Sequence, residues 1–154
     1  MTTTAPTLTT RTVPPAPKEL AARWLDLISA GDVEELCRTA SPTWSMAGGP
    51  PGLPPGPDGI RALVASFGRI RQRWVVEDVI AEGDKVVVRA TNVCEQDTFL
   101  GVPAAGIEQV FSAIFVFRIA EGRVEQIWRT AQDLQRLLQL GATIVPPSSP
   151  RASR

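Results

Sequence analysis

A single change of hydrophobic period, near residue 74, most constrains the fold of this chain. Upstream, apolar residues recur at helical spacing, and the first such stripe is Leu20, Trp24, Leu27 and Ile28. Downstream, segments rich in β-branched residues alternate as strands do, over residues 74–81, 85–95, 107–119 and 123–131. Helices that precede an antiparallel meander indicate an α+β fold. We expect three to four helices packed on an antiparallel sheet, which would enclose an internal pocket if the sheet is strongly curved.

Local signals place the boundaries of these elements. Pro17 suits the first turn of a helix, and Asp32 can cap a second helix over residues 33–40. A short extended piece at 43–46 precedes residues 48–59, whose five prolines and five glycines exclude helix or central strand and indicate a surface loop that can cover a pocket. Asp58 is expected to cap a third helix, and a last helix is expected over 133–140.

Two hairpin signatures join the strands. Glu82-Gly83-Asp84 lies between the first pair of strands and Ala120-Glu121-Gly122 between the second pair. Residues 1–16 are Thr/Pro-rich and, like residues 145–154, lack periodic apolar positions, so both ends are interpreted as disordered tails. Residues 17–144 are therefore expected to form one domain around one core.

The composition excludes several kinds of chemistry. The chain has no histidine, no tyrosine and two cysteines, Cys37 and Cys94. A Ser–His–Asp or Cys–His catalytic unit is therefore impossible within one chain, as is a histidine-based zinc site. Two lone cysteines do not make a metal site. We expect neither a metal nor a cofactor, so acid–base work would fall to Asp, Glu, Lys, Cys or bound water.

Charge and hydropathy limit the partners and the location. Sixteen basic and sixteen acidic side chains give a formal net charge of zero, and no Lys/Arg run exists. Nucleic acid and anionic membrane are therefore not expected as partners. The N-terminus lacks the apolar core of a secretory signal, and no apolar stretch is long enough to cross a bilayer. The expected location is the cytoplasm.

Residues 99–141 carry a resemblance to a known family. The segments are FLGVPAAG at 99–106, IFVFRIAEGRVEQIW at 114–128 and DLQRLLQLG at 133–141, and the upstream segments VVEDVIAEGDKVVVRAT at 75–91 and SAGDVEEL at 29–36 fit as well. In this order and spacing the sequence resembles the SnoaL-like polyketide cyclases of the nuclear transport factor 2-like superfamily. The similarity covers most of residues 20–141.

The resemblance implies a cone with a pocket, a homodimer packed through the outer face of the sheet, and ring closure of a small-molecule polyketide in a secondary-metabolite pathway. Some relatives are instead hydrolases, isomerases, hydroxylases or binding proteins, so the fold alone does not fix the reaction.

One departure from the family pattern concerns the catalytic carboxylate. Family cyclases that run an aldol closure use an Asp four residues after the tryptophan of the last strand; here Trp128 is followed at that distance by Gln132. Asp133 is one residue further and would point away from Trp128 and Gln132 if the strand keeps its register, unless a bulge turns it inward. We favour Gln132 over Asp133 as the pocket residue. A neutral amide cannot accept a proton as a carboxylate does.

Two further departures concern family histidines. Glu95 stands four residues before Phe99, where many relatives carry histidine, and Phe115 replaces another. Glu95 is either a solvated carboxylate at a strand end or a group at the pocket mouth whose pKa burial would raise. Phe115 contacts substrate or belongs to the core. Asn92 would hydrogen-bond a substrate carbonyl if its face of the strand is the concave one, which the pattern leaves open.

The remaining candidates are apolar and aromatic. The resemblance places a cavity among residues expected to contact substrate, namely Trp24, Trp44, Met46, Phe67, Phe99 and Trp128. Ordinary core packing is the alternative for any one of them. The set suits a large, flat, unsaturated ligand.

These residues favour a cyclase that works by shape. The pocket would hold a linear polyketide or polyene in its reactive conformer, while Gln132, Asn92 or Glu95 polarises a carbonyl, as suits an intramolecular [4+2] cycloaddition. The alternatives are an aldol cyclase that uses Asp133 or Glu95, a binder of a hydrophobic small molecule, and a structural domain whose cone is filled.

Overall fold

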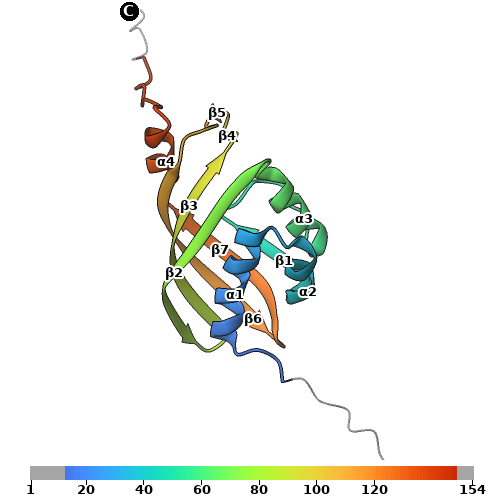
Figure 1. Cartoon of the computed structure of the whole chain (residues 1–154). Coiled ribbons are helices and arrows are strands. Elements are labelled where there is room, and N and C mark those ends of the chain that lie inside the picture. The colour runs from blue at the N-terminus through green and yellow to red at the C-terminus, as the bar shows by residue number, and fades with distance from the viewer. Residues whose placement is uncertain (1–12, 149–154) are drawn as a thin grey trace, which may run out of the picture.

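The computed structural model describes residues 13–148, and these form four helices and seven strands (Figure 1). In chain order the elements are α1 (Pro17–Ala30), α2 (Val33–Thr39), β1 (Ala40–Ala47), α3 (Pro57–Ser66), β2 (Ile70–Glu82), β3 (Lys85–Gln96), β4 (Thr98–Phe99), β5 (Val102–Pro103), β6 (Gln109–Ala120), β7 (Arg123–Ala131) and α4 (Asp133–Gln139). The expected α+β class is confirmed. The expected tails fall largely on residues 1–12 and 149–154, which lie outside the described residues.

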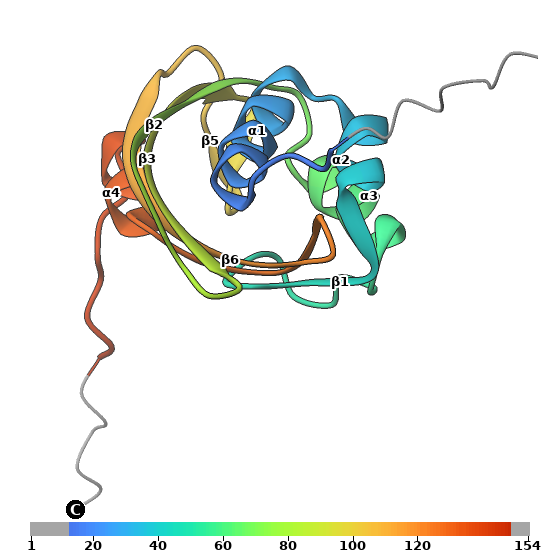
Figure 2. The same ribbon diagram turned by 90° about the horizontal axis from the view of Figure 1, so that it is seen from below.

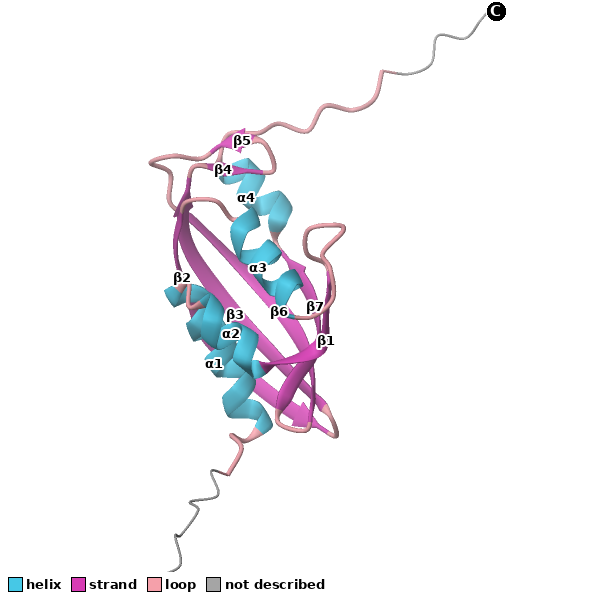
Figure 3. Ribbon diagram, turned by 90° about the vertical axis from the view of Figure 1, so that its right-hand side faces the viewer, coloured by secondary structure: helices cyan, strands magenta, loops and turns pink. Residues whose placement is uncertain are grey.

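The main sheet has the strand order β1-β7-β6-β3-β2. β1 runs parallel to β7, and the other neighbours are antiparallel. Seen along the cone, the strands curve around α1, whereas α4 lies outside the curve (Figure 2). Helices α1, α2 and α3 cover the concave face (Figure 3). Register shifts in the β2–β3, β6–β7 and β1–β7 pairs mark irregularities of the kind that bend strands and let a sheet curl.

Alternation along the strands settles which side chains face inward. On β3 the buried positions are Val86, Val88, Ala90, Asn92, Cys94 and Gln96, and on β6 they are the odd-numbered residues from Gln109 to Ile119. Register pairs Asn92 with Phe111 and Phe115 with Arg129, so these side chains share the concave face. Even-numbered residues of β6 therefore face outward.

Aromatic packing fills the end of the cone where the β2–β3 and β6–β7 turns lie, here called the hairpin end. Trp24 of α1 stacks on Trp44 of β1 with ring centroids 6.1 Å apart. Trp24 also packs edge-on against Phe117, with centroids 6.4 Å apart. Trp44 and Phe117 are both fully buried. The opposite end, where β3 and β7 finish, is called the open end.

Some boundaries differ from the sequence expectations. Asp32 caps α2 as expected, its carboxylate accepting the Glu35 N–H at 3.2 Å. Helix α3, however, begins at Pro57 after Gly56, so Asp58 is a first-turn residue and not the cap. Proline suits that first position because it has no N–H to leave unpaired. Gly56 has φ +74° and a Cβ there would lie 2.3 Å from the Pro42 carbonyl oxygen, so only glycine fits.

Helix α4 takes the place of β7 beside the first part of β6. β7 ends opposite Ala113, which leaves the backbone of residues 109–112 without a strand on that side. The Gln139 side chain donates to the Val110 carbonyl at 2.7 Å and accepts from the Val110 N–H at 2.8 Å. The Ser112 N–H donates to Gln132 Oε1 at 3.0 Å, and the Ser112 carbonyl accepts from the Gln132 backbone N–H at 3.0 Å. Two glutamine amides thus complete the edge.

Candidate functional site

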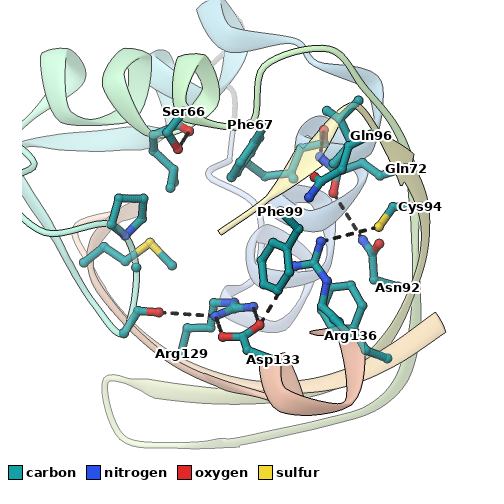
Figure 4. Close-up of a pocket in the computed structure, with 18 of the residues that line it drawn as sticks. Ser66, Phe67, Gln72, Asn92, Cys94, Gln96, Phe99, Arg129, Asp133 and Arg136 are labelled. Carbon is teal, nitrogen blue, oxygen red and sulfur yellow. Dashed lines mark hydrogen bonds and ion pairs between the residues drawn. The ribbon is translucent and has the colours of Figure 1, made fainter. Parts of the chain in front are cut away.

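The open end of the cone holds a cavity of about 530 Å³ (Figure 4). It lies between the concave face of the sheet, helices α1 and α3, the loop at 48–51, and the β4–β5 turn. The volume lies within the range of small-molecule sites. The cone is therefore hollow at this end. This contradicts the filled cone expected of a purely structural domain.

An aromatic wall forms one side of the cavity. Trp74 of β2 packs edge-on against Phe111 and Phe115 of β6, with ring centroids 5.5 and 5.1 Å apart. All three rings line the cavity. Edge-to-face pairs of this kind stabilise one another beyond their burial and hold the rings in fixed planes. The wall presents a rigid apolar surface to a ligand.

A bidentate ion pair lies at the rim. Arg129 of β7 donates from Nη1 to Asp133 Oδ2 at 3.0 Å and from Nη2 to Asp133 Oδ1 at 2.8 Å. The hydrogen bond from Arg129 holds the pKa of the Asp133 carboxyl below its ordinary value, and this outweighs the opposing effect of partial burial. Asp133 is therefore ionised at neutral pH, and Arg129 occupies both of its oxygens.

A second guanidinium lies deeper. Arg136 of α4 is held between two aromatic rings, with its central carbon 3.5 Å from the Phe99 centroid and 4.2 Å from the Phe111 centroid. Its Nε donates to Gln109 Oε1 at 3.2 Å and its Nη2 to Cys94 Sγ at 3.7 Å. Burial lowers the pKa of Arg136 and raises that of the Cys94 thiol.

Amide side chains supply the other polar groups of the wall. Asn92 of β3 donates from Nδ2 to Gln72 Oε1 at 3.2 Å. Asn92 is fully buried, and its Oδ1 has no hydrogen-bond partner within the described part of the chain. An unpaired buried amide oxygen is costly, so this atom can accept a hydrogen bond from a ligand.

The Pro/Gly loop closes one side of the cavity, as the sequence suggested for a surface loop. Gly48, Gly49, Pro50 and Pro51 line it, and the Gly48 carbonyl accepts from Arg129 Nη1 at 3.3 Å. Gly48 has φ +79°, and a Cβ there would lie 2.0 Å from the Arg129 carbonyl oxygen. Only glycine allows the loop to approach β7 this closely.

Seven of the residues singled out from the sequence line the cavity: Trp24, Met46, Phe67, Asn92, Phe99, Phe115 and Asp133. Asn92 faces inward, so its side of β3 is the concave one, a point that the sequence pattern left undecided. Four others do not line it. Trp44 is buried behind Trp24 in the core, and Trp128 pairs with Val116 on the outer face.

The expectation that Gln132 faces the pocket is wrong. Asp133 does line the pocket and Trp128 does not, but Asp133 belongs to α4 and is not a continuation of β7, and the pocket lies on the side of Arg129. Gln132 is also past the end of β7, where it precedes α4 and hydrogen-bonds the edge of β6. The side-chain amide of Gln132 is exposed, and its oxygen accepts the hydrogen bond from the Ser112 backbone N–H.

The placement of Glu95 at the pocket mouth is wrong as well. Residues Arg89, Thr91, Val93 and Glu95 occupy the outer face of β3. Glu95 accepts from Arg71 Nη2 of β2 at 2.7 Å, a pair exposed to solvent. The solvated carboxylate at a strand end was the correct alternative.

Sequence reasoning missed the two arginines and Gln72. Arg129 shares its face with Ile127 and pairs with Phe115, so strand alternation would have revealed it once the concave side was known. Arg136 carries no such signal, because it reaches the cavity from α4 and its place between Phe99 and Phe111 depends on the β4–β5 turn. That two-strand hairpin, with Leu100 and Gly101 at positive φ, was not expected.

Residues 13–148 contain no group of three or more His, Cys, Asp or Glu side chains arranged to hold a metal ion. Within the same range, none of the helices combines the length and the apolar character that crossing a bilayer requires.

Comparisons with known proteins agree with this architecture. Residues 21–127 match the model of the SnoaL-like domain family. The structure of TsrD from Streptomyces laurentii superposes with a TM-score of 0.71 at 29% identity, over 81% of this chain and 94% of that one. A candidate SnoaL-like polyketide cyclase from Jannaschia sp. CCS1 gives a TM-score of 0.70 at 26% identity, over 83% and 93% of the two chains.

Wild-type IdmH from Streptomyces antibioticus, described as a candidate polyketide cyclase, shares the fold, with a TM-score of 0.67 at 24% identity over 83% of this chain and 100% of that one. No curated protein sequence is a significant match. The family model alone spans more than half of the sequence, from α1 to the inward-facing Ile127 of β7. The chain therefore belongs to the SnoaL-like domain family.

Proposed function

We propose that this chain is a polyketide cyclase that closes a ring in a flexible, largely apolar polyketide or polyene intermediate of a secondary-metabolite pathway. The observation that carries the proposal is the hollow, aromatic-walled cavity of about 530 Å³ at the open end of the cone. Membership of a family whose solved structures include candidate polyketide cyclases supports it. A few polar side chains interrupt a largely apolar lining, and a chain bearing carbonyl groups along an apolar skeleton matches that composition.

The proposed mechanism is conformational. A flexible chain confined against Trp74, Phe111 and Phe115 loses the conformers that cannot react. Holding reacting atoms in place can lower a barrier by up to ~7–11 kcal/mol. In an intramolecular [4+2] closure, three π bonds become two carbon–carbon σ bonds and one new π bond, and no proton or leaving group is transferred. Arg136 would hydrogen-bond the carbonyl that activates the alkene, the role first assigned to Gln132.

The electrostatics of Asp133 favour this mechanism over an aldol closure. A general base works best when its pKa lies near the working pH. Asp133 has a lowered pKa and both oxygens paired with Arg129, so it is a weak base at neutral pH. An aldol cyclase that uses Asp133 stays the alternative, because this is the carboxylate among the lining residues. It requires an acidic limb in the pH–rate profile that is absent in Asp133→Asn.

The second alternative is a protein that binds a hydrophobic product without making it. The same cavity would serve it. A binder would show affinity for the cyclic compound and no effect on the rate at which the linear compound is consumed.

The test is a cyclisation assay with linear polyenones that carry a pendant alkene. Liquid chromatography with mass detection would follow conversion to an isomer of the same mass. Phe115→Ala widens the cavity and frees the substrate, so we expect turnover to fall about 10- to 100-fold. Arg73→Ala is the matched control, since this residue lies on the exposed outer face of β2, opposite Val93, and does not line the cavity. Equal rates for Phe115→Ala and the unaltered protein would contradict the proposal.

We also propose that the protein forms a homodimer through the outer face of the sheet. Val110 and Ile114 of β6 are each 47% exposed there, and outward-facing Val116 and Trp128 pair directly beside them. A solvated sheet face ordinarily carries polar residues. A second copy presents the same apolar strip, which makes the face self-complementary about a two-fold axis.

A further inference from the structure

The charges that line the cavity do not cancel. Among the described residues, the charged side chains lining it are Arg129, Asp133 and Arg136, two positive and one negative. Arg129 and Asp133 form the bidentate pair at 2.8 and 3.0 Å. Arg136 approaches the same carboxylate only at 3.9 Å. The short contacts of Arg136 are neutral, an amide oxygen and a thiol.

Packing and hydrogen bonds also fix the position of Arg136. Its side chain is 7% exposed, and the guanidinium lies over both the Phe99 and the Phe111 ring. Stacking leaves only the edge of the planar group, where its N–H donors lie, free to approach a ligand. Arginine has five such donors, and the hydrogen bonds to Gln109 and Cys94 use one at Nε and one at Nη2. A buried cation of this kind is costly unless an anion joins it.

A second unpartnered group faces the same cavity. Asn92 and Cys94 are both inward-facing on β3, two residues apart, and Cys94 is the residue whose sulfur contacts Arg136. Asn92 is fully buried, and its Oδ1 lacks a partner within residues 13–148. The cavity wall therefore combines the Arg136 cation, which has no anion at hydrogen-bond distance among the described residues, with the Asn92 oxygen, which accepts no hydrogen bond from them (Figure 4).

We infer that the ligand of this cavity carries a delocalised oxygen anion, an ionised carboxylate or the enolate of a 1,3-dicarbonyl, which binds the free edge of Arg136. A hydroxyl or N–H group of the same ligand donates to Asn92 Oδ1, and its apolar part lies against Trp74 and Phe115. Two oxygens that share one charge match the fork of a guanidinium. The inference rests on the proposed function in that both use this cavity and both assign Arg136 to an oxygen atom of the ligand.

Equilibrium binding tests this without any turnover. Isothermal titration calorimetry would compare cinnamate with methyl cinnamate, which differ in charge and little in shape. The enolate source is tested with benzoylacetone, titrated below and above its ionisation, against its 2,2-dimethyl derivative, which has no acidic hydrogen between its carbonyls. We expect at least one anion to bind about 10- to 100-fold more tightly than its neutral partner, the range of a charge-assisted hydrogen bond. A preference for cinnamate identifies a carboxylate ligand, and a preference for the diketone enolate alone identifies a 1,3-dicarbonyl.

Variants with opposite expected effects separate the charge from a loss of fold. Arg136→Met keeps an apolar side chain between the rings and should abolish the preference for the anion. Asp133→Asn removes the negative charge and frees Arg129, so it should strengthen anion binding. Arg73→Met, on the exposed outer face of β2 opposite Val93, is the matched control and should change nothing. Damage to the fold would weaken binding in both cavity variants alike.

Three outcomes would overturn the inference: equal affinity for anion and neutral partner, a preference that survives Arg136→Met, or no binding of either probe pair up to its solubility limit. The result is separable from the proposed function. If the unaltered protein prefers the anion but closes no ring, the cyclase proposal is contradicted and the anion subsite is supported. Ring closure in a protein with no anion preference would contradict the subsite alone.

Discussion

At the scale of single residues, the Arg129–Asp133 pair links the chemistry of the rim to its stability. The hydrogen bond from Arg129 lowers the pKa of Asp133 in the folded protein, while the unfolded chain has the ordinary carboxyl value. The pair therefore stabilises the fold above that ordinary value, and the stabilisation is lost as the pH falls through the lower folded-state pKa. Asp133 is partly exposed, so solvent screening keeps the gain small.

We expect Asp133→Asn to reduce the free energy of unfolding by about 1 kcal/mol at neutral pH. The difference from the unaltered protein should shrink below about pH 4, where the carboxyl of the unfolded chain becomes protonated. Urea denaturation at several pH values measures this. Asp97→Asn is the control, because its pair with Arg69 is more exposed and should contribute less. A difference that stays constant down to acidic pH would exclude the ion pair as its cause.

At the scale of elements, the junction between β7 and α4 decides the geometry of the site. β7 stops at Ala131, and Gln132 and Gln139 satisfy the backbone of β6 that β7 no longer pairs. Helix α4 is thereby fixed against β6, which is how Arg136 reaches its place over Phe111. A residue first expected to act on substrate is instead one that positions a helix.

Gln132→Ala and Gln139→Ala should each lower the free energy of unfolding by about 1 kcal/mol, because each leaves a strand-edge backbone group without its partner. Thermal denaturation measures the loss, and faster amide hydrogen exchange at Val110 and Ser112 would locate it. Gln135→Ala is the control, since this exposed glutamine lies on the same helix. Unchanged exchange at both amides would show that the side-chain bonds do not hold the edge.

At the scale of the whole molecule, one cone is packed at one end and hollow at the other. Trp24, Trp44 and Phe117 pack against one another at the hairpin end, whereas Trp74, Phe111 and Phe115 line the cavity at the open end. The packed end stabilises the fold, and the open end leaves room for a ligand. The outer face of the sheet, with its apolar strip on β6, is the surface proposed for the dimer.

Sedimentation equilibrium tests that assembly. We expect the unaltered protein to have twice the mass of one chain, and Ile114→Lys, at the centre of the strip, to shift the equilibrium to the monomer by placing like charges opposite one another across the two-fold axis. Ile80→Lys is the control, since Ile80 is exposed on β2 away from β6. A monomeric unaltered protein at all concentrations would contradict the proposed dimer.

The sequence by itself determined what local chemistry controls. The start of α1 at Pro17, the cap at Asp32 and the two hairpin turns depend on residues near one another in the chain, so the sequence predicted them correctly. The family resemblance supplied the cone and its cavity.

Only the tertiary structure decided which side of the sheet is concave, and that choice reversed the roles of Gln132 and Asp133 and excluded Glu95. Parity fixes relative sides, but the absolute side depends on the curl of the sheet around α1. The same holds for Arg136. Its place between Phe99 and Phe111 joins three segments distant in sequence, and only packing brings them together.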